Sequence, residues 1–289
     1  MPLPNLRFAV FTDLHVGSNT SGGWHNRFLT DDPAATTRAV VTTINRATPD
    51  FTLVLGDLAD HGTAAELAAA RAALDWLHGP WLALRGNHDV APGADGVAFA
   101  QALGGRAQTG LVPPGLLPLP AGVVALTFEA RWETVDGRWR VAIPEEELRN
   151  ALDALADQTP ELLLALCHFP FVRQSEFIQS HDSQGRNAGT LWEGEAALAE
   201  LAARAGTLLC FAGHQHFHHV VTGANWLHCT TASLVEYPAE YRLVTVGADG
   251  VQIETRPAAP DIVAAALAPV VTWVAGRDED REQLWWPRR

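Results

Sequence analysis

Aspartate, asparagine and histidine side chains directly follow five short apolar segments of this 289-residue chain. At two of these places, in Asp13-Leu14-His15 and His214-Gln215-His216, two such side chains stand two positions apart. Side chains two apart share one face of an extended chain, so each pair can point at a single centre. The five groups are Asp13-Leu14-His15, Gly56-Asp57-Leu58-Ala59-Asp60, Gly86-Asn87-His88-Asp89, His168, and Gly213-His214-Gln215-His216.

Carboxylates, an amide and imidazoles that meet at one place would make a metal centre. The two pairs suggest two metal ions, and Asp57 offers a carboxylate that can bridge them. Asn87 and His168 would complete a shell of oxygen and nitrogen ligands that needs no thiolate. Such a shell suits Mn, Fe, Co or Zn and differs from a closed structural zinc site built of cysteines. The sequence leaves the choice among these metals open.

These motifs resemble those of the calcineurin-like metallophosphoesterase superfamily. Within residues 10–216 they run in the same order: Asp-x-His, Gly-Asp-x-x-Asp, Gly-Asn-His-Asp, a lone His after a strand, and Gly-His-x-His. The run from Gly56 to Thr63, followed by Gly86-Asn87-His88-Asp89, is most similar to the class III branch of cyclic-nucleotide and glycerophosphodiester phosphodiesterases. One departure from that branch is Cys167-His168, where its members usually carry two histidines.

The resemblance implies a role for each of these residues. The implied metal ligands are Asp13, His15 and His216 for one ion, Asn87, His168 and His214 for the other, and Asp57 for both. It also implies in-line attack of a metal-bound hydroxide on the phosphorus of a small organic phosphate ester. His88 would assist at the phosphoryl group, and Asp60 would orient His88.

The expected substrate is a phosphodiester, and three alternatives stay open. These are a broad phosphomonoesterase, a nucleotide pyrophosphohydrolase, and a non-catalytic scaffold with the same fold. A long segment, Phe171–Trp192, leaves the strand before it at the mouth of the expected site, and loops of this length are usually functional. The candidate substrate contacts are His25, Asn87, His88, Arg173, Arg186 and Asn187, because guanidinium and amide groups suit phosphate oxygens.

Short buried strands alternating with helices must position these side chains. Such a series predicts a largely parallel sheet, in which the carboxyl ends of the strands share the edge where ligands bind. The predicted strands are Arg7–Thr12, Phe51–Leu55, Trp81–Leu84, Val123–Phe128, Leu162–Cys167 and Leu208–Phe211, and the predicted helices are Ala34–Ala47, Ala64–Leu77, Glu145–Leu155 and Glu193–Ala205.

After Ala212 the pattern changes to strands and turns, which predicts a second, mostly antiparallel sheet. Its expected strands are Phe217–Thr222, Asn225–Thr231, Tyr241–Val246 and Val251–Arg256. The predicted fold class is therefore α/β (α+β): a four-layer α-β-β-α sandwich of two mixed β-sheets flanked by helices. We expect a metallophosphoesterase domain over residues 1–256. A C-terminal helical tail, residues 257–289, would pack on or beside it, with a helix near Ile262–Val274.

The charge balance excludes several functions. Asp and Glu number 33 against 20 basic residues, all of them Arg, so the net charge is −13 and no Lys is present. Lysine nucleophiles, pyridoxal Schiff bases and Gly-Lys-Ser/Thr phosphate loops are therefore excluded, and nucleic acid is disfavoured as a partner. No apolar run reaches the roughly 18 residues of a membrane span. Three dispersed cysteines indicate reduced, buried thiols and a cytoplasmic protein, with a homo-oligomer left open.

Overall fold

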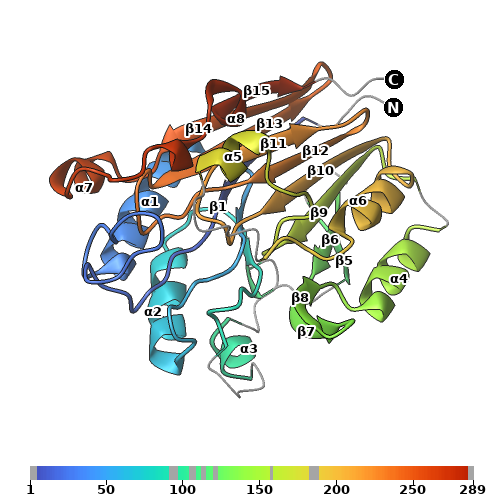
Figure 1. The fold of residues 1–289 in the computed structure, drawn as a ribbon. Coiled ribbons are helices and arrows are strands. Elements are labelled where there is room, and N and C mark those ends of the chain that lie inside the picture. The colour runs from blue at the N-terminus through green and yellow to red at the C-terminus, as the bar shows by residue number, and fades with distance from the viewer. Residues whose placement is uncertain are drawn as a thin grey trace.

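Two β-sheets pack face to face between helices in the computed structural model (Figure 1), which describes residues 5–90, 97–103, 109–111, 115–119, 123–156, 159–181 and 189–285. The seven-stranded sheet has the order β15-β14-β13-β1-β2-β3-β4, and the six-stranded sheet has the order β11-β12-β10-β9-β6-β5. The strands of the first sheet are β1 (Leu6–Phe11), β2 (Phe51–Val54), β3 (Trp81–Ala83), β4 (Thr109–Leu111), β13 (Glu240–Gly247), β14 (Gly250–Pro257) and β15 (Glu282–Trp285). Those of the second are β5 (Gly115–Pro118), β6 (Val124–Phe128), β9 (Leu162–Cys167), β10 (Thr207–Ala212), β11 (His219–Thr222) and β12 (Trp226–Thr230).

Helices cover the outer face of each sheet. α1 (Pro33–Ala47) and α2 (Ala64–Leu74) lie on the first sheet, and α4 (Glu145–Ala154) and α6 (Gly194–Ala202) lie on the second (Figure 1). The sandwich expected from the sequence is confirmed. The shorter helices are α3 (Val97–Leu103), α5 (Glu176–His181), α7 (Pro260–Ala265), a 3₁₀ turn at Trp273–Ala275, and α8 (Asp278–Arg281). Among the described residues, no helix combines the length and apolarity needed to cross a membrane.

Successive side chains of a strand point to opposite faces of the sheet, and this alternation places apolar residues in both layers of the core. Phe8 and Val10 of β1 point between the two sheets, whereas Ala9 and Phe11 point toward α1 and α2. Phe8 stacks on Phe51 of the neighbouring strand at 5.0 Å between ring centroids and meets Phe211 of the opposite sheet edge-on at 5.6 Å. Burying apolar surface on both faces of the central strands stabilises the sandwich and fixes their register.

The strands after Ala212 do not form a sheet of their own, so that expectation is wrong. β12 pairs in parallel with β10 and belongs to the second sheet, while β13 pairs antiparallel with β1 and extends the first. The first sheet is therefore parallel from β1 to β4 and antiparallel from β1 to β15, whereas the second has a parallel centre and an antiparallel strand at each edge. Strand periodicity does not identify the partner of a strand, because that pairing depends on contacts far apart in sequence.

A β-hairpin that the sequence analysis did not predict stands apart from both sheets. Its strands are β7 (Arg131–Val135) and β8 (Arg138–Ala142), and they pair only with each other. Most of the described side chains of the hairpin are exposed, and Asp136-Gly137 form its turn with positive φ at both residues. That turn geometry favours Asp-Gly and matches the twist of a two-residue hairpin loop.

The C-terminal segment adds a strand to the first sheet. The helix expected near Ile262–Val274 is wrong, because α7 ends at Ala265 and an extended stretch follows up to the 3₁₀ turn. β15 then pairs antiparallel with β14. The division of the chain into residues 1–256 and 257–289 stays a prediction.

A buried ionic contact ties α8 to the first sheet. The guanidinium of Arg281 donates to both carboxylate oxygens of Glu240, at 2.6 and 2.7 Å, and His218 Nε2 lies 3.3 Å from the same carboxylate. Burial raises the pKa of Glu240, but hydrogen bonds from His218 and Arg281 outweigh it and hold that pKa at about 2, below the ordinary 4.5. The carboxylate therefore stabilises the fold in its ionised form.

We expect Glu240→Gln to lower the free energy of unfolding at neutral pH by on the order of 2–3 kcal/mol. Because the folded pKa is depressed, the contribution of Glu240 is complete above pH 4.5 and is lost as the pH falls toward 2. Urea unfolding of both proteins at several pH values measures this, and the two curves should converge in acid. Glu254→Gln, which removes a partly exposed carboxylate, is the control and should change stability by less than about 1 kcal/mol. A constant difference between wild type and Glu240→Gln from pH 7 to pH 2 would contradict this assignment.

Candidate metal centre

The polar residues after β1, β2, β3, β9 and β10 meet at one edge of the sandwich. Three overlapping groups have their potential ligand atoms within 4.8 Å of one another, and nearly all of these side chains are buried or half-buried. Asp57 belongs to two of the groups and therefore joins them. The groups are Asp13, His15 and His216; His15, Asp57 and His88; and Asp57, His168 and His214.

The two buried carboxylates each use one oxygen for the backbone and keep the other for the cluster. Asp13 Oδ2 accepts a hydrogen bond from the His214 N–H at 3.1 Å, while its Oδ1 has no hydrogen-bond partner and lies 3.4 Å from His216 Nε2. Asp57 Oδ1 accepts from the His88 N–H at 2.8 Å. Asp57 Oδ2 lies 3.2 Å from His168 Nε2 and 3.8 Å from His15 Nε2, so this oxygen faces both groups.

Three histidines are held by Nδ1 so that Nε2 faces the cluster. The Nδ1 of His15 lies 3.1 Å from Asp60 Oδ1, and that of His216 lies 2.7 Å from Glu236 Oε1. His168 Nδ1 donates to the carbonyl of Leu55 at 2.8 Å. An acceptor at Nδ1 fixes the orientation of the ring and leaves Nε2 as the ligand atom, which is the usual arrangement behind metal-binding histidines.

The second group of ligand atoms includes an amide. Asn87 Oδ1 lies 3.2 Å from His168 Nε2. The ring of His214 lies 5.2 Å from that of His168. Its Nε2 packs against Gly189, where a Cβ would stand only 2.1 Å from that nitrogen. Glycine at position 189 therefore lets the backbone pass directly beside the cluster.

Asp60 contacts His88 through its backbone, and its carboxylate serves a different histidine. His88 Nδ1 donates to the Asp60 carbonyl at 2.8 Å, whereas the carboxylate lies 4.0 Å from that nitrogen and 3.1 Å from His15 Nδ1. The expected orienting contact to His88 is thus a main-chain one. The Asp60 side chain instead orients His15.

The electrostatics keep the carboxylates ionised. Burial raises the pKa of Asp13 and Asp57, but the neighbouring His216 and His168 outweigh it and leave both pKa values below the ordinary range. The converse holds for the imidazoles. Burial lowers the pKa of His168 and His216, yet Asp57 and Asp13 raise them to about 9 and about 10. The buried, ionised carboxylates at this edge of the sandwich therefore need positive charge beside them.

The residues present fit a pair of divalent ions. Asp13 Oδ1 is buried without a hydrogen-bond partner, and His15 Nε2 and His216 Nε2 face each other at only 3.2 Å. Two imidazole nitrogens and a bare carboxylate oxygen that converge in this way are satisfied together by one metal ion. The donors are oxygen and nitrogen throughout, which suits Mn, Fe, Co or Zn.

A sequence model described as calcineurin-like phosphoesterase matches residues 6–218. The chain belongs to the calcineurin-like phosphoesterase family. It is therefore a metal-dependent hydrolase of phosphate esters. No curated protein matches its sequence.

Solved structures share the fold of this calcineurin-like phosphoesterase. A dimetal phosphatase from Danio rerio is 15% identical with a TM-score of 0.62, over 88% of this chain and 97% of that one. A purple acid phosphatase from yellow lupin seeds is 14% identical with a TM-score of 0.59, over 88% of this chain and 52% of that one. A 5'-nucleotidase from Candida albicans is 14% identical with a TM-score of 0.54, over 90% of this chain and 54% of that one. At these identities the likeness concerns the fold alone.

The candidate substrate contacts lie in different places. His25 lies beside the cluster, where its Nε2 is 3.1 Å from the carbonyl of Gln215. Arg173 lines a separate hollow, and its N–H donates to Glu195 at 3.4 Å. Arg186 and Asn187 lie outside the described residues. A second hollow of about 440 Å³ adjoins Asn87 and is lined also by Arg85, Arg131, Trp132 and Phe169.

The sequence analysis missed Glu236, the buried carboxylate behind His216. Its Oε2 also accepts from the N–H groups of Trp24, His25 and Asn26, at 3.3, 3.1 and 2.8 Å. Burial raises the pKa of Glu236, but hydrogen bonding to His216 outweighs it, so the net shift is downward. No local motif marks this residue. The signal in the sequence is an acidic residue that follows two apolar ones, in Leu234-Val235-Glu236.

We expect Glu236→Gln to weaken metal binding about 10- to 100-fold, because His216 loses the charged acceptor that orients it. Titration of the metal-free protein with Mn²⁺, followed by elemental analysis after dialysis, measures this. The matched control is Glu240→Gln, which removes a buried carboxylate that contacts His218 and Arg281 instead. The control should keep the wild-type metal content, and equal losses in both variants would show that the effect is only one of stability.

Proposed function

We propose that this calcineurin-like phosphoesterase hydrolyses small organic phosphodiesters with two metal ions. The proposal rests on Asp57, whose Oδ2 faces His168 on one side and His15 on the other. A single carboxylate oxygen between two nitrogen-rich groups is the arrangement of a bridging ligand. In this proposal the ligands are Asp13, His15 and His216 for one ion, Asn87, His168 and His214 for the other, and Asp57 for both.

The two ions would supply charge for the attacking and leaving oxygens and lower the pKa of water. The chain supplies the remaining parts. His88 is half-buried beside Asp57 and His15, and its Nδ1 is bound to the Asp60 carbonyl, so its Nε2 is available for the phosphoryl group or the leaving oxygen. A positioned imidazole can donate a proton there or stabilise charge that develops in the transition state.

The charge around Asn87 favours a diester over a monoester. A phosphodiester carries one negative charge, whereas a phosphomonoester carries close to two at neutral pH. Arg85 and Arg131, the two arginines of the hollow beside Asn87, both lie against the carboxylate of Glu129. The single carboxylate of Glu129 offsets one of their two positive charges, and the one positive charge that remains matches the single charge of a diester. The hollow, of about 440 Å³, has room for a second organic group.

Rates on a bis-aryl phosphate, an aryl phosphate and a cyclic nucleotide test the proposal. With the Mn²⁺-loaded protein, we expect kcat/KM for the bis-aryl phosphate to exceed that for the aryl monoester at equal leaving group. The reverse order would make the protein a phosphomonoesterase. Hydrolysis of none of these esters by metal-loaded protein would favour the scaffold alternative.

We expect Asp57→Asn to lose at least one metal ion and most of the activity while the chain stays folded. The amide cannot supply a charged oxygen to two ions, and the fold keeps its hydrophobic core. Elemental analysis, circular dichroism and the diester assay together measure this. Asp75→Asn, at the exposed end of α2, is the control and should keep both metals and the wild-type rate. Full metal content and full rate in Asp57→Asn would contradict the two-metal assignment.

We expect His88→Ala to keep both metals and to lose roughly 10²–10⁴-fold in kcat, the range for a positioned acid or base. Its imidazole lies beside the cluster but is not one of the proposed ligands. His78→Ala, an exposed histidine after α2, is the control and should leave kcat unchanged. Loss of metal from His88→Ala would instead make this histidine a ligand.

A further inference from the structure

An aromatic hollow of about 410 Å³ lies between the β7–β8 hairpin and the segment that leads into α6. Its walls include Trp132 and Trp139 of the hairpin, Phe171, and Trp192. The three indoles remain 39%, 74% and 37% exposed, respectively, so apolar ring surface faces the open space. Exposed indoles that gather in one concave place mark a surface built to be covered by a ligand.

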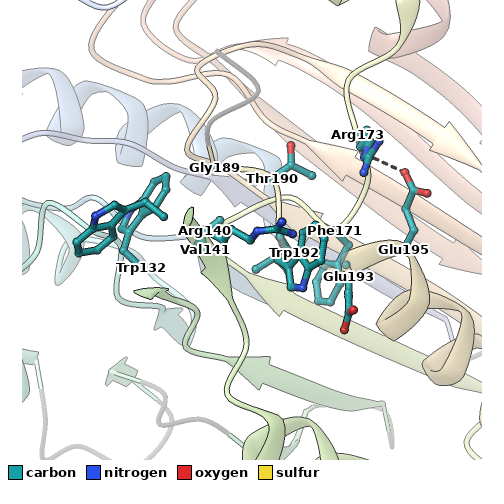
Figure 2. Close-up of a pocket in the computed structure, with 13 residues that line it drawn as sticks. Trp132, Arg140, Val141, Phe171, Arg173, Gly189, Thr190, Trp192, Glu193 and Glu195 are labelled. Carbon is teal, nitrogen blue, oxygen red and sulfur yellow. Dashed lines mark hydrogen bonds between the residues drawn. The ribbon is translucent and has the colours of Figure 1, made fainter. Parts of the chain in front are cut away.

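Charged side chains also line this hollow, so a ligand could form hydrogen bonds or ionic contacts there in addition to apolar ones. The Arg140 guanidinium lies over the ring of Trp192, 3.1 Å from its centroid (Figure 2). Its buried Nη1 has no hydrogen-bond partner among the described residues. Arg173, Glu193 and Glu195 stand at the rim. A ligand here can therefore meet donors and acceptors as well as aromatic faces.

The hollow adjoins the proposed metal centre. Trp132 lines both this hollow and the one beside Asn87. The ring of Trp132 meets Phe169 edge-on at 6.1 Å, and Phe169 lies 4.4 Å from the ring of His214. Gly189 lines the hollow as well and packs against the His214 imidazole. Gly189 thus touches both the hollow and the cluster, so the two sites are neighbours.

We propose that the hollow binds a planar heteroaromatic ring, such as a nucleobase, carried by the non-reacting part of the phosphodiester. This assignment rests on the proposed function, since the ester must lie at the metal centre. A heteroaromatic ring offers a flat face to the indoles and ring or carbonyl acceptors to Arg140. Its amino or imino hydrogens suit the carboxylates of Glu193 and Glu195. An acyl chain would use the indoles but would form no hydrogen bond with Arg140, Glu193 or Glu195.

Two diesters with the same leaving group test the assignment: the p-nitrophenyl ester of thymidine 5'-phosphate, and methyl p-nitrophenyl phosphate. For the Mn²⁺-loaded protein we expect kcat/KM to be at least about tenfold higher for the thymidine ester. Trp192→Ala and Trp139→Ala should each reduce this ratio severalfold. Trp76→Ala, an equally drastic change at an exposed indole after α2, is the matched control and should leave the ratio unchanged.

Binding of free thymidine separates this assignment from the proposed function, because the nucleoside cannot be hydrolysed. We expect thymidine to quench the tryptophan fluorescence saturably in the wild type and in Trp76→Ala, but with a weakened affinity in Trp192→Ala. Saturable binding without hydrolysis of either ester would overturn the proposed function and support the base site. Hydrolysis of both esters at equal kcat/KM, with no thymidine binding, would overturn the base site alone. An equal gain with benzyl p-nitrophenyl phosphate would show that the hollow takes any aryl group, which overturns the heteroaromatic assignment.

Discussion

The burial of two carboxylates, Asp13 and Asp57, at the carboxyl ends of neighbouring parallel strands is the constraint on which the site depends. An isolated ionised carboxylate in an apolar interior costs far more than the whole stability of a domain. The structure meets this cost with backbone N–H donors from His214 and His88 and with the imidazoles around them. The other oxygen of each carboxylate, Oδ1 of Asp13 and Oδ2 of Asp57, faces the imidazoles of the cluster. The same constraint explains why the polar groups gather where both sheets end, since only there can so many donors converge on a buried point.

The backbone at the cluster is held in a conformation that ordinary residues avoid. Five residues of the three strand-end turns have positive φ: Asp13 at 55°, His15 at 40°, Asp57 at 52°, His214 at 67° and His216 at 56°. Each such residue costs of order 1 kcal/mol, and such strain persists only where the surrounding structure imposes it. The left-handed conformation turns the backbone at the end of the strand. Two residues that stand two positions apart, such as Asp13 and His15, can then direct their side chains to the same centre. Gly86 completes the arrangement, because a Cβ there would stand 2.1 Å from Asp57 Oδ1.

The sequence was sufficient for the strands that end at the cluster, β1, β2, β3, β9 and β10, and for the polar residues that follow them, because both signals are local. A short apolar run followed by Asp, Asn or His is visible without knowing any partner strand, and the described structure places Asp13, His168 and His216 within one cluster. The sequence could not predict features that depend on contacts between residues far apart in the chain, such as the pairing of strands. β12 joins the second sheet and β13 the first, because β12 pairs with the free edge of β10 and β13 pairs with the free edge of β1. Trp132 and Arg140 lie on a hairpin of mostly exposed residues, whose sequence pattern resembles an ordinary surface loop. Their meeting with Trp192 in the aromatic hollow depends on contacts distant in sequence.

Glu236 shows how a residue without a motif can govern the centre. Its Oε1 binds His216, and its Oε2 binds three consecutive N–H groups of the loop that carries Trp24 and His25. Asn26 of the same loop exchanges hydrogen bonds with Val270 and Val271, so the C-terminal segment holds the loop from behind. If the loop moved away, Oε2 would remain buried without donors, and the carboxylate would be destabilised along with its contact to His216. The orientation of His216, a proposed metal ligand, is therefore coupled to the position of the Trp24–Asn26 loop, because the buried carboxylate of Glu236 binds both.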